Sequence, residues 1–299
     1  MIELGDGGSE VEGSLLDAAT PKSSTNPPTL TMHAGSLGDS DTAAGGGGKA
    51  GTPSTPTGRS VASVVDKSKL VSQTLLHFAK GGGLNVDYCF TREDSFYGAG
   101  MNTIKLVLHN TTNLPLTNVR VGQLRLEDGM ELQPFGEVAT LAPAGKSSVN
   151  LYVDFGGKTR GAKFEILTDK GVFPVVLNPP AGELVAPLCL SEAEFDGLAK
   201  GLRGMHEAKQ AITGLEDKAV DLIRERVTLL CNLYPLDPVQ HPTSHATPST
   251  FKFAGRRMNA EKTPLLITID VAGGQVRGNS EMTLLSRQII KDIKETLSK

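Results

Sequence analysis

The chain has 299 residues and a formal net charge of −3. This length suffices for two domains of about 100–150 residues and a tail, and so balanced a charge excludes a strong global field for holding nucleic acid. The acidic start MIELGDGGSE lacks a signal peptide's apolar core, and no apolar run reaches the roughly 18–20 residues of a membrane-spanning helix. Because Cys89, Cys189 and Cys231 lie far apart, we expect reduced, buried thiols in a reducing compartment.

Residues 1–66 are rich in Gly, Ser, Thr and Pro, and no aromatic residue precedes Phe78. Such a segment buries too little apolar surface to offset the entropy of ordering. We therefore predict a disordered hinge or linker. Leu15, Leu16 and Asp17 form an apolar pair with an acid in this polar setting, and a chance pair without function is the simplest interpretation of them.

Residues 67–180 carry the pattern of an antiparallel, immunoglobulin-like β sandwich. The runs LNVDYCF (84–90), NTIKLVLHN (102–110) and SVNLYVDF (148–155) alternate apolar with polar residues, as half-buried strands do. Further strands are predicted within 118–132, with turns at Gly122 and at Asp128-Gly129, and two more within 162–177. Strands at this spacing without a helical segment are typical of a sandwich, and Pro174 then belongs on an edge strand or at a bulge.

Residues 181–299 are predicted to form a small α+β platform domain, a sheet with helices packed on one side. Ser191 followed by Glu194 is a capping box at a helix start. Strands are predicted at 249–258, 264–273 and 274–279. The apolar stripes of two further helices are Leu215, Ala219, Leu222, Ile223, Val227 and Leu230, and then Met282, Leu285, Ile289, Ile293 and Leu297.

Motifs for catalysis, cofactors or metals are weak or missing. GGGGKAGT (45–52) has Ala50 where a phosphate loop needs Ser or Thr after its Lys. GGGLNVDY (81–88) precedes a strand, which favours a flexible approach to the sandwich over a dinucleotide fingerprint. Prolines around His241 and His245 oppose the helix that would aim both imidazoles at one metal.

No nucleophile motif of a serine or cysteine hydrolase is present, so we expect a non-enzymatic binding module without a cofactor. Arg256 and Arg257 have two interpretations, a contact to phosphate or an acidic peptide and a plain surface turn. The sequon Asn110-Thr111-Thr112 would carry a glycan only in an exported protein.

The stretch NPPAGELVAPLCLSEAEF (178–195) resembles the C-terminal region of the β subunit of adaptor-protein complex three, a β-adaptin. The likeness continues upstream in LLHFAKGGGLNVDYCFTRE, in FYGAGMNTIKLVLHNTTNLPLTNVRVG and in LAPAGKSSVNLYVDF. The residues that match the family's inter-lobe segment are Pro179, Pro180, Gly182, Glu183, Leu184, Pro187, Ser191, Glu192 and Phe195.

This resemblance implies a hinge followed by an appendage, or ear, with a sandwich and a platform. It implies a non-enzymatic role in vesicle-mediated transport, sorting cargo from endosome and Golgi membranes to lysosomes and related organelles. The implied partners are accessory trafficking proteins, clathrin and the other subunits of the complex, reached through a trunk that this chain lacks, so that the chain looks like a fragment. The implied location is cytoplasmic, peripheral on Golgi, endosomal and coated-vesicle membranes, with indirect membrane association and no nucleic-acid partner.

The resemblance gives Leu15, Leu16 and Asp17 a second interpretation, a degenerate clathrin-box peptide, although Ala18 and Ala19 replace its later leucine and acid. Related appendages use a platform tryptophan to bind peptides, and this chain has no Trp. Phe251 and Phe253 share one strand face, which favours core packing for both. The alternative to an adaptor is a sandwich module that binds a carbohydrate or cell-surface ligand.

Overall fold

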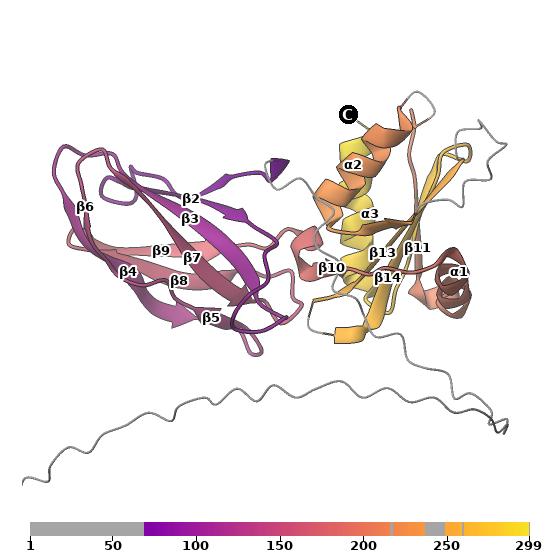
Figure 1. The fold of residues 1–299 in the computed structure, drawn as a ribbon, viewed down its shortest axis with the longest axis horizontal. Helices are drawn as coiled ribbons and strands as arrows, with labels where there is room; N and C mark the ends of the chain where they lie inside the picture. Colours follow the sequence, from indigo (N-terminus) through magenta and orange to yellow (C-terminus); the bar gives the residue numbers. More distant parts are fainter. Residues whose placement is uncertain (1–68, 216–217, 237–248, 259, 299) are drawn as a thin grey trace, which may run out of the picture. The chain divides into compact units, whose positions relative to one another are not determined.

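The computed structural model describes residues 69–215, 218–236, 249–258 and 260–298 (Figure 1). All of these residues belong to one compact unit. Leu15, Leu16 and Asp17, the glycine-rich run 45–52, and His241 and His245 lie outside the described residues.

The first half of the described chain is a sandwich of two antiparallel sheets, as the alternating pattern predicts. One sheet has the strand order β1-β2-β3-β7-β5 and the other β6-β4-β8-β9. The strands are β1 (Gln73–Leu76), β2 (Leu84–Phe90), β3 (Asn102–Asn110), β4 (Leu116–Arg125), β5 (Glu131–Gln133), β6 (Val138–Leu141), β7 (Lys146–Asp154), β8 (Ala162–Thr168) and β9 (Gly171–Leu177). Apolar residues of both sheets, such as Ile104 and Ile166, face each other in the core because alternate side chains of a strand point to one face.

Two local predictions in the sandwich are wrong. Gly122 does not end a strand but lies inside β4, where the register to β8 shifts between Val121 and Leu124. A β-bulge absorbs the extra residues there and keeps the strand continuous. The glycine run before β2 is a tight turn rather than a flexible approach, because Gly83 has a φ of +95° and a Cβ there would lie 2.1 Å from Thr112 Cγ2. Pro174 lies on the edge strand β9, as predicted.

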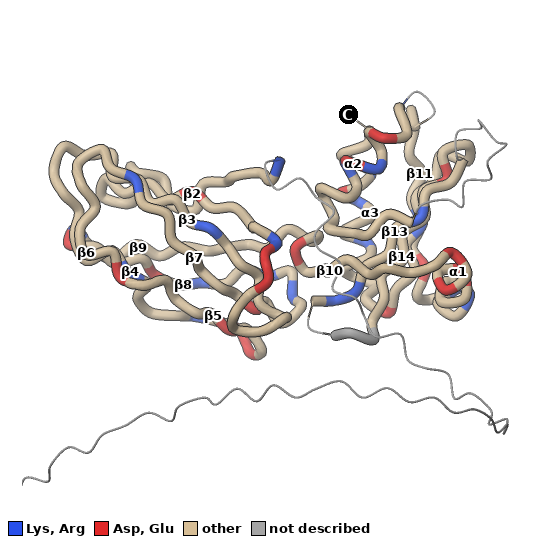
Figure 2. Tube along the Cα trace, in the orientation of Figure 1, with Lys and Arg blue, Asp and Glu red and all other residues tan. Residues whose placement is uncertain are grey.

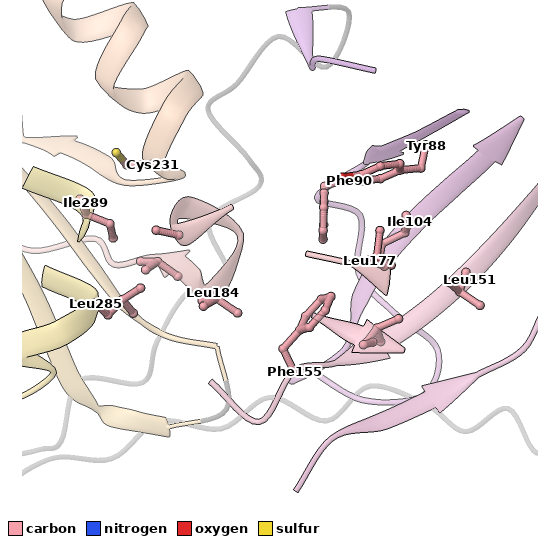
Figure 3. Packing of buried hydrophobic residues seen from close by; sticks show 14 of the residues in the cluster. Tyr88, Phe90, Ile104, Leu151, Phe155, Leu177, Leu184, Cys231, Leu285 and Ile289 are labelled. Atoms are coloured by element: carbon pink, nitrogen blue, oxygen red, sulfur yellow. The ribbon is translucent and has the colours of Figure 1, made fainter. Parts of the chain in front are cut away.

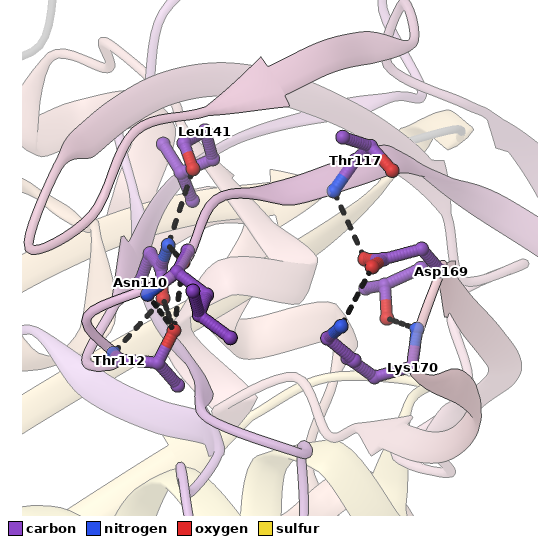
Figure 4. Close-up of polar contacts among 8 residues, drawn as sticks. Asn110, Thr112, Thr117, Leu141, Asp169 and Lys170 are labelled. Carbon is purple, nitrogen blue, oxygen red and sulfur yellow. Dashed lines mark hydrogen bonds and ion pairs between the residues drawn. The ribbon is translucent and has the colours of Figure 1, made fainter.

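Asn110 anchors the turn that follows β3 and is fully buried (Figure 4). Its side-chain amide donates to the carbonyls of Leu114, Leu141 and Ala142, at 2.7, 3.1 and 3.1 Å. Its carbonyl oxygen accepts from the backbone N–H and the hydroxyl of Thr112. The folded chain therefore uses this sequon to close a turn, and its amide nitrogen is not accessible to a glycan.

The second half is an α+β platform built on a six-stranded antiparallel sheet with the order β10-β13-β14-β15-β11, in which β12 also pairs with β13. The strands are β10 (Val185–Pro187), β11 (Glu207–Ala211), β12 (Tyr234–Leu236), β13 (Thr250–Arg257), β14 (Ala260–Asp270) and β15 (Gln275–Asn279). The helices are η2 (Ala181–Leu184), α1 (Glu192–Gly201), η3 (Gly204–His206), α2 (Val220–Cys231) and α3 (Thr283–Leu297).

The helices cover both faces of the platform sheet, which corrects the prediction of a single covered face (Figure 1). Phe251 and Phe253 of β13 pack with α2 and α3 in the main core, as their shared face predicts. Ala254 and Leu266 face the other way and pack against Phe195 of α1. The predicted α2 stripe also begins too early, because Leu215 is buried before the helix starts at Val220.

The hydrophobic core runs without a break from the sandwich to the platform. Phe155 of the loop after β7, Leu184 of η2 and Leu285 of α3 belong to one cluster of buried residues (Figure 3). Of the three cysteines, all free, only Cys231 is buried. Cys189 is exposed and Cys89 half-buried, so the expectation of three buried thiols is wrong for these two.

Candidate functional site

The segment that connects sandwich and platform is held by close backbone packing. Gly182 lies in η2, and a Cβ at this position would come within 2.2 Å of the Leu230 carbonyl oxygen at the end of α2. Only glycine allows that approach. Pro180 precedes η2, and Pro187 pairs with Gly255 in the sheet. The predicted inter-lobe residues thus fix the path of the chain onto the platform.

Glu183 forms a buried ion pair with Arg92, which follows β2 in the sandwich. The Arg92 guanidinium donates to the Glu183 carboxylate at 2.6 and 3.1 Å, and the two side chains are only 4% and 8% exposed. Arg92 also donates to the carbonyl of Leu229 at 2.7 Å, so a cation satisfies an otherwise open carbonyl at the C-terminus of α2. Burial raises the pKa of Glu183, while Arg92 opposes that shift. This contact ties sandwich and platform together.

Helix α1 begins at the predicted capping box. The Ser191 hydroxyl accepts from the Glu194 backbone N–H, and the Glu194 carboxylate accepts from the Ser191 backbone N–H at 2.8 Å. These bonds satisfy free N–H groups of the first helical turn. Phe195 then turns inward and is 1% exposed, while Glu192 and Asp196 stay near the surface. The capping box therefore sets which face of α1 meets the sheet.

A hollow of about 340 Å³ opens between α1 and the sheet. Residues from α1, β11, β13, β14 and β15 surround it, and Figure 2 shows that α1 carries charges of both signs. The lining residues are Phe195, Asp196, Ala199, Lys200, Arg203, Glu207, Lys252, Thr268, Arg277 and Asn279. Four of these side chains are cationic and two are anionic, so this α1 hollow has an excess of positive charge.

Two of the four cations of the α1 hollow are held by carboxylates. Lys252 Nζ lies 2.8 Å from both Glu192 Oε1 and Asp196 Oδ1, and 5.6 Å above the Phe195 ring. Burial disfavours the charged ammonium, but the two carboxylates outweigh it, so the pKa of Lys252 lies above its ordinary value. Arg277 Nε lies 3.1 Å from Glu207 Oε1. The exposed side chains of Lys200 and Arg203 supply the excess charge, which suits an acidic peptide.

The sequence-predicted residues divide between two places. Pro179, Pro180, Gly182, Glu183, Leu184 and Pro187 lie in the connecting segment or in β10, whereas Ser191, Glu192 and Phe195 build the start of α1 beside the hollow. Sequence reasoning missed Arg92, Lys252 and Arg277, because each gains its role from a partner far along the chain. Arg256 and Arg257 end β13 rather than forming a turn, and Arg257 donates to the Gly156 carbonyl at 2.6 Å.

Among the described residues, no group of three or more His, Cys, Asp or Glu side chains is placed to hold a metal ion. In the same part of the chain, none of the helices is both long and apolar enough to cross a bilayer.

Two family models match the chain in order. The model for the C-terminal part of the clathrin-adaptor complex-3 beta-1 subunit matches residues 10–160, and the model for the C-terminal domain of AP-3 complex subunit beta-1 matches residues 182–297. The AP-3 complex subunit beta-2 of Mus musculus is 30% identical over 77% of this chain and 21% of that protein. The AP-3 complex subunit beta-1 of Homo sapiens is 28% identical over 81% and 22%.

Among solved structures, the GAE domain of GGA2p from Saccharomyces cerevisiae matches 37% of this chain and 98% of its own, with 15% identity and a TM-score of 0.27. The chain spans about a fifth of the length of the curated relatives that it matches. The first family model alone covers half of the chain, on the sandwich side, and the second covers the platform. The chain belongs to the family of C-terminal regions of AP-3 complex β subunits.

Proposed function

We propose that this chain is the hinge and appendage of an adaptor β subunit and that it acts in vesicle-mediated transport without catalysing a reaction. The observation that carries the proposal is the pair of family matches, which follow each other along the chain and extend over sandwich and platform. Residues 1–66 would serve as the hinge, 67–180 as the sandwich part of the appendage and 181–299 as the platform part.

We also propose a cellular setting for the appendage. The appendage would hang from a trunk that assembles with the other adaptor subunits, on the cytoplasmic side of Golgi and endosomal membranes. It would recruit accessory proteins while cargo is sorted towards lysosomes and related organelles. Leu15, Leu16 and Asp17 would add a weak clathrin contact, because an apolar pair beside an acid suits docking of an extended peptide in a groove. A hinge that links two weak binding sites in one chain would raise the effective concentration of each contact.

The α1 hollow is the recognition surface that we propose for accessory proteins. Lys200 and Arg203 are exposed cations at its rim, while the charges of Lys252 and Arg277 are balanced by carboxylates. Acidic peptides of partner proteins would therefore be steered to this face of the platform. Phe195, the aromatic residue that lines the hollow, is 1% exposed, so the hollow would bind a partner by charge more than by an aromatic anchor.

The test is affinity capture from cytosol with the full chain as bait, read by mass spectrometry. We expect coat and trafficking proteins, with accessory proteins lost from the Lys200→Glu/Arg203→Glu variant and clathrin lost from the Leu15→Ala/Leu16→Ala/Asp17→Ala variant. Lys146→Glu/Lys163→Glu is the matched control, because it reverses two exposed charges on the sandwich. If the parent chain captures no coat or trafficking protein, the proposed function is wrong.

A further inference from the structure

Strand β11 is an edge of the platform sheet in the part of the chain that the structure describes. It is the last strand in the order β10-β13-β14-β15-β11 and pairs only with β15 among the described strands. Edge strands expose a row of backbone donors and acceptors, which another extended chain can pair with.

The register of β11 against β15 shows which groups are free. Ser280 N–H donates to the His206 carbonyl at one end, and Ile212 N–H donates to the Gly274 carbonyl at the other. Hydrogen-bonded and non-hydrogen-bonded pairs alternate in an antiparallel ladder. The backbone N–H and C=O groups of Ala208 and Gln210 therefore bond to β15, whereas those of residues 207, 209 and 211 point away from it. The backbone N–H of Glu207 donates to the Gly204 carbonyl and is therefore not open to another strand. The groups open to another strand, among the described residues, are the carbonyl of Glu207 and both backbone groups of Lys209 and Ala211.

A hollow lies on each side of this edge. The α1 hollow reaches Glu207 and Arg203 on one face of the sheet. A second hollow of about 310 Å³ runs along β11 below α3, lined by Glu207, Ala208, Lys209, Gln210, Arg287 and Ile290. Because side chains of a strand alternate between faces, a strand added to β11 would place successive side chains into the two hollows in turn.

The charged side chains around β11 indicate which kind of strand could pair with it. Arg203 flanks β11 in the α1 hollow, and Arg287 flanks it in the second hollow. Both are exposed, and the single carboxylate of this edge, Glu207, already has Lys209 and Arg277 within 3.1 Å. A second copy of the chain paired through β11 in the register centred on residue 209 would bring Lys209 opposite Lys209, which is unfavourable. The remaining positive charge instead favours carboxylates.

We infer that β11 binds an extended, acidic segment of about four to five residues from a partner protein as an additional strand of the platform sheet. Its backbone pairs with Lys209 and Ala211, and its acidic side chains meet Arg203 on one face and Arg287 on the other. This addition of a strand to β11 rests on the proposed function, because it describes how the platform would hold a peptide of an accessory protein.

The first experiment uses the unaltered full chain and a synthetic probe, a fluorescein-labelled Thr-Val-Glu-Glu-Glu-Val-Thr peptide, whose successive Glu side chains point to opposite faces of an extended strand. With ¹⁵N-labelled alanine, the Ala211 amide should exchange quickly with solvent in the free chain and be protected when the peptide binds. Ala208, whose N–H already bonds to β15, should exchange slowly in both states. Binding of the peptide without new protection of Ala211, or no binding at all, would overturn the inference.

Substitutions then separate backbone pairing from charge. Lys209→Pro removes the outward N–H and the cation, whereas Lys209→Ala removes the cation alone. We expect Lys209→Pro to weaken peptide binding by about tenfold more than Lys209→Ala, because only the proline variant lacks the donor. Arg287→Glu should weaken binding by about tenfold or more. Lys294→Glu is its control, an equal charge change on α3 at an exposed residue outside both hollows.

The capture experiment tests the proposed function, whereas protection of the Ala211 amide and the Lys209 variants test strand addition at β11. If the chain captures coat proteins but the Ala211 amide is not protected by the peptide, the proposed function is supported and strand addition at β11 is contradicted. Protection of Ala211 by the acidic peptide, but not by a peptide with Lys in place of each Glu, supports strand addition at β11 even if no coat protein is captured. Equal affinities of the Lys209→Pro and Lys209→Ala variants would contradict it.

Discussion

At the scale of single residues, the buried Arg92–Glu183 pair should not tolerate the loss of either partner. Removing one partner leaves the other charge buried without compensation, which costs about 3–5 kcal/mol in proteins generally. We expect Arg92→Ala or Glu183→Ala to lower the free energy of unfolding by an amount of this order. Urea denaturation followed by circular dichroism measures it.

The control for this prediction is an ion pair of the same types on the surface. Arg120 lies 3.5 Å from Glu137, and the two side chains are 49% and 45% exposed. Water screens such a pair, so Arg120→Ala should cost less than about 1 kcal/mol. Equal losses for Arg92→Ala and Arg120→Ala would mean that the buried pair does not stabilise the contact between sandwich and platform.

At the scale of elements, the start of α1 should depend on pH. The hydrogen bonds from Ser191 lower the pKa of Glu194 in the folded chain. A lowered pKa stabilises the fold above the ordinary glutamate pKa of about 4.3, and the contribution is lost as pH falls through the folded value. The difference in unfolding free energy between the parent and Glu194→Gln should therefore be largest near neutral pH and shrink on acidification.

Ser191→Ala is the companion variant for this titration. It removes the hydroxyl that bonds to Glu194, so the parent should lose stability relative to it over the same acidic range. Denaturation series between pH 7 and pH 3 give both differences. A gap between parent and Glu194→Gln that stays constant over this range would show that the capping box does not set the pKa of Glu194.

The elements that the sequence predicts well are those whose causes are local. The capping box needs residues three apart, and the alternation in β2, β3 and β7 needs only neighbours on one strand. Strands β10, β11 and β12 have three to five residues and no clear alternation, so pairing with distant strands creates them. The α1 hollow was missed for the same reason, because Lys252 lies 60 residues from Glu192 in the chain.

At the scale of the whole molecule, the continuous core predicts that sandwich and platform unfold together. One cluster of buried residues includes Phe155 of the sandwich and Cys231 at the end of α2, and the Arg92–Glu183 pair joins the two parts. A shared core makes each part lose apolar contacts when the other opens, which is the physical basis of a cooperative transition. The sequence alone predicts two domains but not how strongly they are coupled.

Cys231 supplies a probe of the platform for this prediction. Burial raises the pKa of its thiol, so it is protonated and shielded in the folded chain and reacts only after the platform opens. In a Cys89→Ser/Cys189→Ser background, its labelling in urea should have the same midpoint as the loss of β-sheet circular dichroism. Arg92→Ala should move both midpoints to lower urea. Labelling of Cys231 well before the circular dichroism changes would mean that the platform opens alone and that the continuous core does not couple the two parts.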